Sequence, residues 1–372
     1  MKIGERGDDC DGRAELGAEG GDECGVGDGF SGDGLGSAGE SEAAAGTQPT
    51  SEPAAPAAPA APAAGDSSDI TDDEFEALLD QLHGKGNFAS MLDAVVLGLT
   101  GSAGKTTTKE LTAAILERCG STLRTAGNLN NHIGVPLTVL RLRSEHRIGV
   151  VELGMNHPGE IALLSAVAQP TVALVNNAQR EHQEFMASVA AVAEENGAVL
   201  HGLAADGVAV FPADEEFTPR WRAISAARPV RDFGLNDEAA IRGTYVTKEF
   251  GSLLTLNANG QTFSAHLAAA GVHNVRNALA ACAATLAIGI PPDMIVRGLE
   301  AFTPVAGRLQ RKSAKNGALL IDDTYNANPD SVRAAIDVLA AAPAPRTLVL
   351  GDMGEVGSEG IAFHQEIGSY AR

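Results

Sequence analysis

Short apolar runs separated by polar, glycine-rich segments characterise the chain beyond residue 93. Three of them, at 94–99 (AVVLGL), 148–153 (IGVVEL) and 172–175 (VALV), are of strand length and apolar throughout, except for Glu152 near the end of the second. Strands buried on both faces of a parallel sheet have this pattern. A segment with helical spacing, from about Lys105 to Arg118, follows the first run. The pattern predicts an α/β fold in which a mostly parallel sheet is flanked by helices.

Shorter apolar runs continue the pattern towards the C-terminus. Three of them between residues 241 and 268 are separated by Gly and Asn, which predicts an antiparallel insertion. Two more, at 318–321 and 347–350, each end in a polar loop. The first of these loops reads DDTYNANP, which indicates a turn followed by a helix that begins with proline. We therefore expect two further strand–helix units after residue 309.

The first 90 residues have a different composition. Residues 1–92 hold 20 acidic and 4 basic side chains, and residues 53–64 read PAAPAAPAAPAA. A segment so poor in apolar residues cannot bury enough area to offset its chain entropy, and the Ala-Pro tract is typical of an extended linker. We predict a disordered acidic leader over residues 1–90, with one short helix near 71–83.

Composition excludes several classes of function. The chain has 372 residues and a formal net charge of −21, from 27 basic and 48 acidic side chains. Nucleic acids and anionic membranes attract basic surfaces, so we expect neither as a partner. No apolar run is long enough to span a membrane, and the start lacks a secretory h-region. Four scattered cysteines indicate reduced thiols in a cytoplasmic protein.

A glycine-rich loop with a lysine follows the first apolar run and precedes the first helix. In this context, backbone N–H groups bind phosphate oxygens, the lysine reaches the β and γ phosphates, and the threonine hydroxyl ligates Mg²⁺. Leu99 stands where the full GxxxxGK[ST] spacing has its first glycine, so a glycine-rich turn without a ligand is the alternative. We predict a P-loop-type site formed by Thr100, Gly101, Ser102, Ala103, Gly104, Lys105, Thr106 and Thr107.

One cluster of asparagines and two single polar residues are further candidates for ligand contact. Asn128, Asn130 and Asn131 lie in an asparagine-dense loop, and amide side chains both donate and accept hydrogen bonds, which suits sugar or peptide recognition. Glu152 ends the second apolar run, where it could hold Mg²⁺ directly or through water. His182 lies just past the third run. The alternatives are asparagines that only form turns, a carboxylate that caps the next helix, and a surface histidine.

Seven motifs follow one another along the chain. They are TGSAGKTTTKE (100–110), TAGNLNNHIGVPLT (125–138), VELGMNHPGEI (151–161), VNNAQREHQEF (175–185), GVHNVRNALAA (271–281), GRL (307–309) and IDDTYNANPDS (321–331). In this order they resemble the Mur ligase superfamily, and most specifically its MurF family. The AGNLNN and ELGMNHPGEI forms are similar to MurF rather than to other branches. The resemblance covers roughly residues 93–372.

The resemblance implies an ATP-dependent amide ligase of peptidoglycan precursor synthesis. Its members phosphorylate a peptide carboxylate and then join an amine to it, here D-Ala-D-Ala to UDP-MurNAc-tripeptide. ATP and Mg²⁺ are the implied cofactors. By matching position, the implied catalytic residues are Lys105, Glu152 and His182, and the magnesium residues are Thr106, Glu152 and His182. The implied nucleotide contacts are the loop 100–107, Asn274, Arg308, Asp323, Tyr325 and Asn326, of which the last three are expected near the ribose and adenine base. The implied substrate contacts are Asn128, Asn130 and Asn131.

The chain also departs from the resembled family. The leader stands where the family has a uridine-diphosphate-binding domain, and the Rossmann-like third domain is truncated. Asn196 stands where many members carry a carbamylated lysine, for which Glu194 or Glu195 would compensate. We expect a central ATP-binding domain at 91–308, a partial C-terminal domain at 309–372, and a monomer. The alternatives are a non-catalytic nucleotide-binding fragment or fusion product, and a MurE-like or folylpolyglutamate synthase-like ligase.

Overall fold

A computed structural model describes residues 2–3 and 94–372 of the chain, which fall in one compact unit. The predicted leader at 1–90, its Ala-Pro linker and the helix near 71–83 lie outside the described residues. The exception is Lys2–Ile3, which forms the short strand β1. None of the described helices is long and apolar enough to cross a membrane.

A mostly parallel sheet organises residues 95–267. Within the described residues it has nine strands in the order β10-β9-β8-β7-β6-β5-β2-β4-β3. The pairs from β3 through to β8 are parallel, as the continuously apolar runs predict. The strands are β2 (Val95–Thr100), β3 (Thr122–Arg124), β4 (Ile148–Glu152), β5 (Val172–Val175), β6 (Val208–Pro212), β7 (Val230–Gly234), β8 (Ile241–Lys248), β9 (Gly251–Ala258) and β10 (Gln261–Leu267).

The antiparallel segment predicted at 241–268 is present, but it extends the main sheet. β8, β9 and β10 pair antiparallel with one another. β8 also pairs in parallel with β7, at Phe233–Ile241 and Gly234–Arg242. The three strands therefore lengthen the same sheet and do not form a separate insertion. Period-two patterning within a strand does not encode which neighbouring strand it pairs with, so the pairing to β7 was not predicted.

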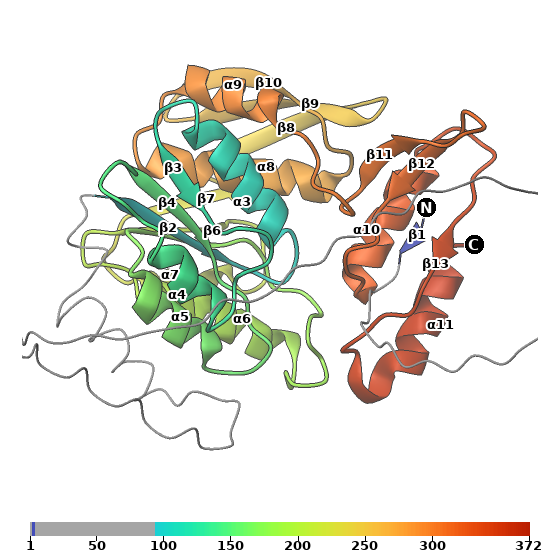
Figure 1. The fold of residues 1–372 in the computed structure, drawn as a ribbon, viewed down its shortest axis with the longest axis horizontal. Coiled ribbons are helices and arrows are strands. Elements are labelled where there is room, and N and C mark those ends of the chain that lie inside the picture. Colours follow the sequence, from blue (N-terminus) through green and yellow to red (C-terminus); the bar gives the residue numbers. More distant parts are fainter. Residues whose placement is uncertain (1, 4–93) are drawn as a thin grey trace, which may run out of the picture. The chain divides into compact units, whose positions relative to one another are not determined.

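Helices cover both faces of this sheet (Figure 1). One face carries α3, α8 and α9, and the other carries α4, α5, α6 and α7. Such double cover is what buried parallel strands require. The helices are α3 (Lys105–Leu116), α4 (Gly134–Val139), α5 (Glu160–Ala168), α6 (Val189–Gly197), α7 (Thr218–Ser225), α8 (Val272–Ala287) and α9 (Pro292–Ala301), with a 3₁₀ turn η1 (Ala198–Leu200).

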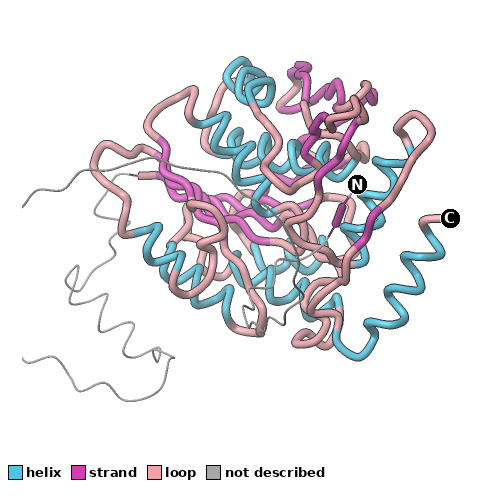
Figure 2. Tube along the Cα trace, turned by 45° about the vertical axis from the view of Figure 1, so that its right-hand side comes forward, coloured by secondary structure: helices cyan, strands magenta, loops and turns pink. Residues whose placement is uncertain are grey.

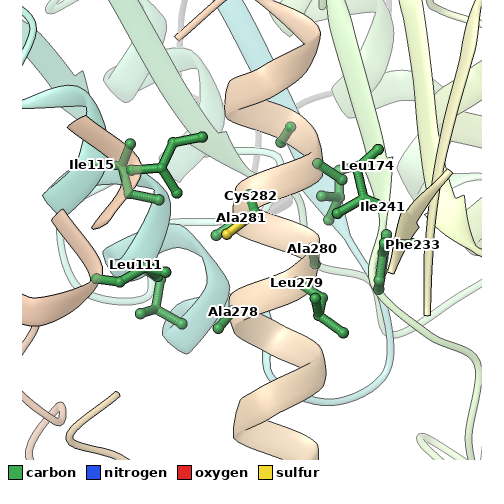
Figure 3. Packing of buried hydrophobic residues seen from close by; sticks show 14 of the residues in the cluster. Leu111, Ile115, Leu174, Phe233, Ile241, Ala278, Leu279, Ala280, Ala281 and Cys282 are labelled. Carbon is green, nitrogen blue, oxygen red and sulfur yellow. The ribbon is translucent and has the colours of Figure 1, made fainter. Parts of the chain in front are cut away.

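Helix α8 lies at the centre of the core on its face of the sheet. Its buried stretch Ala278–Cys282 packs between Leu111 and Ile115 of α3 and the strand residues Leu174, Phe233 and Ile241 (Figure 3). Small alanine side chains allow these elements to approach closely, which explains how a core with few aromatic residues is filled. Burial raises the pKa of the Cys282 thiol, so this cysteine is an inert core residue.

Residues 310–370 form a smaller α/β unit (Figure 2). Within the described residues its sheet has the order β11-β12-β1-β13, with β1 parallel to both β12 and β13. Helix α10 begins at Pro329, as predicted, and Asn328 and Ser331 form a capping box at its start. The elements are β11 (Gln310–Ser313), β12 (Leu319–Asp322), α10 (Pro329–Ala340), β13 (Val349–Leu350), η2 (Gly357–Glu359) and α11 (Gly360–Tyr370).

The fold places the polar loops of the sequence at one edge of the main sheet. β2, β4 and β5 are neighbours and run parallel, so their carboxyl ends lie side by side. The loops that begin after Thr100, Glu152 and Val175 therefore converge there. This is the edge at which open α/β sheets bind ligands.

Candidate active site

The glycine-rich loop connects β2 to α3, as predicted. Gly104 has a φ of 78°, a left-handed conformation that favours glycine. A Cβ atom there would lie 2.3 Å from Asn277 Oδ1, so the loop rests directly on helix α8. Gly101 is equally confined, since a Cβ atom would lie 2.8 Å from Asn176 Cβ. The backbone can pass here only because both residues lack side chains.

Two asparagines after β5 hold this loop in place. Asn177 Nδ2 donates to Ala103 O at 2.9 Å, and Ala103 N donates back to Asn177 Oδ1 at 2.8 Å. Asn176 Nδ2 donates to Ala103 O at 2.7 Å and to Asn277 Oδ1 at 2.9 Å. The sequence motif contained these asparagines, but their supporting role was not predicted. The signal available was a pair of asparagines directly after a buried strand.

Lys105 is the first residue of α3, and its amine is fully engaged. Nζ donates to Gly101 O at 2.7 Å and to Ser102 O at 3.4 Å. It also forms an ion pair with Glu181 Oε1 at 2.7 Å. The lysine therefore lies at the loop, where a phosphate-binding residue is needed, but with a carboxylate as its partner. Glu181 is a site residue that the sequence did not single out.

Glu152 lies at the end of β4 and is almost completely buried, with 1% of its surface exposed. Thr106 Oγ1 and Asn130 Nδ2 donate to its Oε1 at 3.2 and 2.9 Å. Its Oε2 lies 3.2 Å from Nζ of Lys109, a lysine with no exposed surface. The buried charge is thus paired, as a stable interior requires. Lys109 is a second residue that sequence reasoning missed, because nothing local marks a lysine of α3 as buried.

His182 lies between two carboxylates. Its Nε2 is 3.4 Å from Glu181 Oε1, and its Nδ1 is 2.5 Å from Glu355 Oε2 in the loop after β13. Burial lowers the pKa of His182, but the two carboxylates outweigh this effect and raise it to about 9. The ring is therefore a cation at neutral pH. His182 has a φ of 49°, so the backbone is held in a left-handed conformation that is costly for this residue.

The three predicted substrate asparagines all line one hollow beside Lys105. Asn130 already holds Glu152, and its backbone O accepts from Gly154 N at 2.8 Å. Asn131 Oδ1 accepts from Gly134 N at 2.9 Å, at the start of α4. The side-chain oxygen of Asn131 therefore stabilises a turn, as the alternative interpretation predicts. The side chain of Asn128 makes no comparable hydrogen bond within the described residues, and it lines the hollow.

A second hollow collects the residues predicted to contact the nucleotide. It is lined by the loop residues Ala103, Gly104 and Thr107 and by the five predicted residues Asn274, Arg308, Asp323, Tyr325 and Asn326. These five come from α8, from the connection before β11 and from the loop after β12. The structure therefore brings together residues that span more than 50 positions of sequence.

Arg308 and Asp323 are held in place at this hollow. The Arg308 guanidinium lies 4.0 Å from the centre of the Tyr325 ring, and its Nη2 donates to Thr106 Oγ1 at 3.0 Å. Asp323 Oδ1 accepts from Leu309 N at 3.0 Å. Burial raises the pKa of Asp323 to about 6, although the Leu309 N–H and the charge of Arg308 act in the opposite direction.

The two hollows are continuous along the phosphate loop. Both are lined by Ala103, Gly104, Arg308, Tyr325 and Asn326. The second hollow is lined by the residues predicted to contact the base and ribose. The first hollow is lined by Lys105, Thr106, Glu152 and His182. A nucleotide that lay along the loop would place its base in one hollow and its terminal phosphate in the other.

The Mur ligase middle domain matches residues 99–285 of the chain, and the Mur ligase glutamate ligase domain matches residues 307–372. The chain belongs to the Mur ligase family. The resemblance found in the sequence is thereby confirmed, and so is the α/β fold class with its mostly parallel sheet.

Relatives of this Mur ligase chain are named for one reaction. The UDP-N-acetylmuramoyl-tripeptide–D-alanyl-D-alanine ligase of Escherichia coli K12 is 43% identical over 75% of the chain and 62% of its own length. MurF of Acinetobacter baumannii is 37% identical, with a TM-score of 0.73 over 76% of this chain and 62% of that one. MurF of Thermotoga maritima, in complex with ADP, is 26% identical, with a TM-score of 0.72 over 83% and 71%. The chain thus spans about three fifths of the curated relatives that it matches.

This Mur ligase chain has a neutral amide at the position implied for a carbamylated lysine. Asn196 has no exposed surface; its Oδ1 accepts from Thr100 Oγ1 at 2.7 Å, while its Nδ2 is buried without a hydrogen-bond partner. Glu195 accepts from Gly159 N and Ile161 N at the start of α5, and Glu194 pairs with Arg220 at the surface. Both carboxylates are thus engaged by other partners in this structure, and compensation by Glu194 or Glu195 stays a prediction.

The residues around Glu152 fit the magnesium ion that the Mur ligase family implies. Glu152 and Thr106 offer carboxylate and hydroxyl oxygens, and Glu152 Oε2 is buried without accepting a hydrogen bond. No three His, Cys, Asp or Glu side chains in the described part of the chain are grouped closely enough to hold a metal alone. Mg²⁺ is usually held by one or two carboxylates together with phosphate oxygens and water, so this arrangement suits it.

Proposed function

We propose that this Mur ligase chain carries the ATP-dependent step that joins D-Ala-D-Ala to UDP-MurNAc-tripeptide in cytoplasmic peptidoglycan precursor synthesis. Two kinds of observation support this proposal. The similar proteins from Escherichia coli and Acinetobacter baumannii are named for that ligase or for MurF. The catalytic, nucleotide and substrate residues expected for such a ligase line two hollows that meet at one phosphate loop.

The single observation that carries the proposal is the contact between the phosphate loop and the smaller α/β unit. Arg308 contacts Thr106 and Tyr325 together, so the loop, the predicted metal-ligating hydroxyl and the predicted base-contacting ring form one wall. Arginine suits this position because its planar guanidinium stacks on an aromatic ring and still donates hydrogen bonds. A nucleotide bound here would have its phosphates between Lys105 and Arg308.

The residues of the first hollow fit acyl-phosphate chemistry. The γ-phosphoryl group of ATP moves to the peptide carboxylate and ADP leaves; the acceptor nitrogen then attacks the carbonyl carbon, the C–O bond to phosphate breaks, and the nitrogen loses a proton. Lys105 and Arg308 would neutralise the moving phosphoryl group. When bound between Thr106 and Glu152, Mg²⁺ would supply further charge neutralisation at the phosphate oxygens.

Substrate recognition would fall to the polar wall of the first hollow. Asn128, His132 and Asn156 line it together with residues of the phosphate loop. Peptide and sugar groups present both donors and acceptors, which amide side chains satisfy in pairs. We infer that the peptide carboxylate, which accepts the phosphoryl group, approaches Lys105 from this side, because the other hollow is lined by the residues predicted to contact the nucleotide.

The test is ligation by the whole chain. With ATP, Mg²⁺, UDP-MurNAc-tripeptide and D-Ala-D-Ala, mass spectrometry should detect the pentapeptide product, and phosphate release should require both substrates. A full-length MurF serves as the positive control, and a diamino acid and glutamate replace D-Ala-D-Ala to test the other ligase types. Calorimetric binding of ATP–Mg²⁺ without any ligation would overturn the catalytic proposal and favour a nucleotide-binding fragment.

A further inference from the structure

Glu181 provides the charged partner of Lys105 in the nucleotide-free site. Its side chain is about nine-tenths buried, and Oε1 lies 2.7 Å from Lys105 Nζ. The other two acceptors of the lysine are the neutral carbonyls of Gly101 and Ser102. A lysine ammonium has three donors, and all three are in use. A phosphate that binds Lys105 must therefore replace one acceptor, and Glu181 is the anionic one of the three.

The second oxygen of Glu181 has no hydrogen-bond partner. Oε2 is buried, and no donor in the described part of the chain reaches it. An unpaired buried carboxylate oxygen is costly, and the cost increases when the neighbouring cation turns to another anion. After Lys105 had moved to a phosphate, His182 Nε2, at 3.4 Å, would be the one cation within 4 Å of Glu181 among the described contacts. The incoming phosphates would add negative charge beside it.

Glu181 also faces the hollow that contains the proposed magnesium residues. It lines this hollow together with Thr106 and Glu152. Glu152 Oε2 also accepts no hydrogen bond, although it lies 3.2 Å from Lys109 Nζ. Two carboxylates and a hydroxyl at a phosphate-binding loop are the oxygen ligands that Mg²⁺ takes in addition to phosphate and water. The unpartnered Oε2 of Glu181 thus points to a cation that arrives with the nucleotide.

We propose that Glu181 makes nucleotide binding depend on a divalent cation: it neutralises Lys105 in the empty site and becomes a magnesium-facing carboxylate once Lys105 turns to the phosphates. This inference rests on the proposed ATP site. It assigns to Glu181 a role distinct from that of Glu152, whose Oε2 is paired with Lys109 and not with the phosphate-binding lysine. It also explains why a carboxylate lies against the phosphate-binding lysine, where it would otherwise only oppose the ligand.

The inference is separable from a purely positioning role. If Glu181 only held Lys105 in the correct rotamer, its replacement would weaken ATP binding equally with and without metal. If it faces magnesium, Glu181→Gln should tighten metal-free ATP binding, because the competing anion is gone. The same change should reduce the increase in ATP affinity that Mg²⁺ produces. The ratio of the two dissociation constants, with EDTA and with Mg²⁺, therefore distinguishes the two roles.

The experiment is isothermal titration calorimetry of ATP into the whole chain, with Mg²⁺ or with EDTA and without the peptide substrates. Coupling between two ligands at adjoining sites is typically about 5- to 150-fold. We expect the Mg²⁺-to-EDTA affinity ratio of the wild-type chain to fall by about 10-fold in Glu181→Gln. Glu184→Gln is the matched control, since Glu184 is an exposed residue of the same loop. Its ratio should equal that of the wild type.

Each outcome is informative. An unchanged ratio in Glu181→Gln, or equal weakening in both buffers, overturns the magnesium role while leaving the proposed function standing. A wild-type chain that binds ATP in neither buffer overturns both. Melting temperatures of the variants establish that they fold. Glu181→Asp keeps the charge on a shorter side chain, so its Mg²⁺-to-EDTA affinity ratio should lie closer to that of the wild type than the ratio of Glu181→Gln does.

Discussion

Arg308 Nη2 donates a hydrogen bond to Thr106 Oγ1 at 3.0 Å, and these residues are 202 positions apart in the chain. The same guanidinium stacks on Tyr325. The contact connects the start of α3 with the segment that leads into the smaller sheet. The proposed nucleotide site is therefore formed jointly by the two regions that the family domains match.

Removing this guanidinium should weaken nucleotide binding. Charge-assisted hydrogen bonds contribute about 1.5–3 kcal/mol each, so Arg308→Ala should raise the dissociation constant for ATP–Mg²⁺ on the order of 10- to 100-fold in calorimetry. Arg308→Lys keeps the charge but loses the planar stacking on Tyr325, so it should recover only part of the affinity. Full affinity in Arg308→Ala would show that the contact with Thr106 is structural only.

Lys105→Ala should abolish turnover without unfolding the chain. The lysine begins α3 and contacts only the loop and Glu181, so its loss removes no core contact. Loss of one electrostatic group at a reaction centre typically costs on the order of 10²–10³ in turnover. The measurements are phosphate release and the melting temperature, with the exposed Lys315→Ala as control. A large fall in melting temperature would instead indicate that the ion pair with Glu181 holds the fold.

Glu215 should make the chain less stable as pH rises. Burial raises the pKa of its carboxyl to about 7 from an ordinary 4.5, although the Ala178 N–H and the charge of Arg276 oppose this. The folded state therefore binds the proton more tightly than the unfolded state, so stability falls between about pH 4.5 and 7. At about 1.4 kcal/mol per pKa unit, the loss is about 3 kcal/mol.

Urea denaturation of Glu215→Gln at pH 5 and pH 8 checks this expectation. The variant should lose less stability over this interval than the wild-type chain does. Glu216→Gln is the matched control, because Glu216 carries the same charge but is exposed, whereas Glu215 lines the second hollow. Identical pH dependence in wild type and Glu215→Gln would contradict the prediction.

Arg180 should hold helices α10 and α11 to the main sheet. Its guanidinium donates to both carboxylate oxygens of Asp330 in α10 and to Glu366 in α11, and it lies 5.4 Å from the centre of the Phe363 ring. A network of this kind, part-buried and bidentate, contributes about 1 kcal/mol. In Arg180→Ala, hydrogen exchange should accelerate in α10 and α11 but not in α8. Uniform exchange rates in wild type and variant would show that other contacts dominate.

The sequence predicted the elements whose cause is local. β2, β4 and β5 were recognised because strands buried on both faces are continuously apolar, and α10 because Asn328-Pro329 is a strong helix start. The site residues from the glycine-rich loop to Asn326 were found by type and order, and the structure places them at two joined hollows. Their functional roles stay predictions, as do the domain boundaries at 90, 308 and 309.

What the sequence did not show depends on contacts between distant segments. The burial of Lys109 beside Glu152, and the approach of Glu181 to Lys105 across 76 positions, follow from how β4 and β5 flank β2. The parallel pairing of β8 with β7 joins strands that are adjacent in the chain, and it was not predicted either. None of these contacts produces a periodic pattern in the sequence, because each involves a single polar side chain or a single strand register.

Helix α8 belongs to the site and to the core at once. The Asn277 side chain packs directly against Gly104. The next residues, Ala278 to Cys282, fill the space between α3 and the strands. The phosphate loop cannot loosen by itself, because its support is the same rigid segment that packs the interior. On slow heating, the loss of ATP binding should therefore coincide with global melting, with no intermediate range of temperature in which the chain is folded but unable to bind.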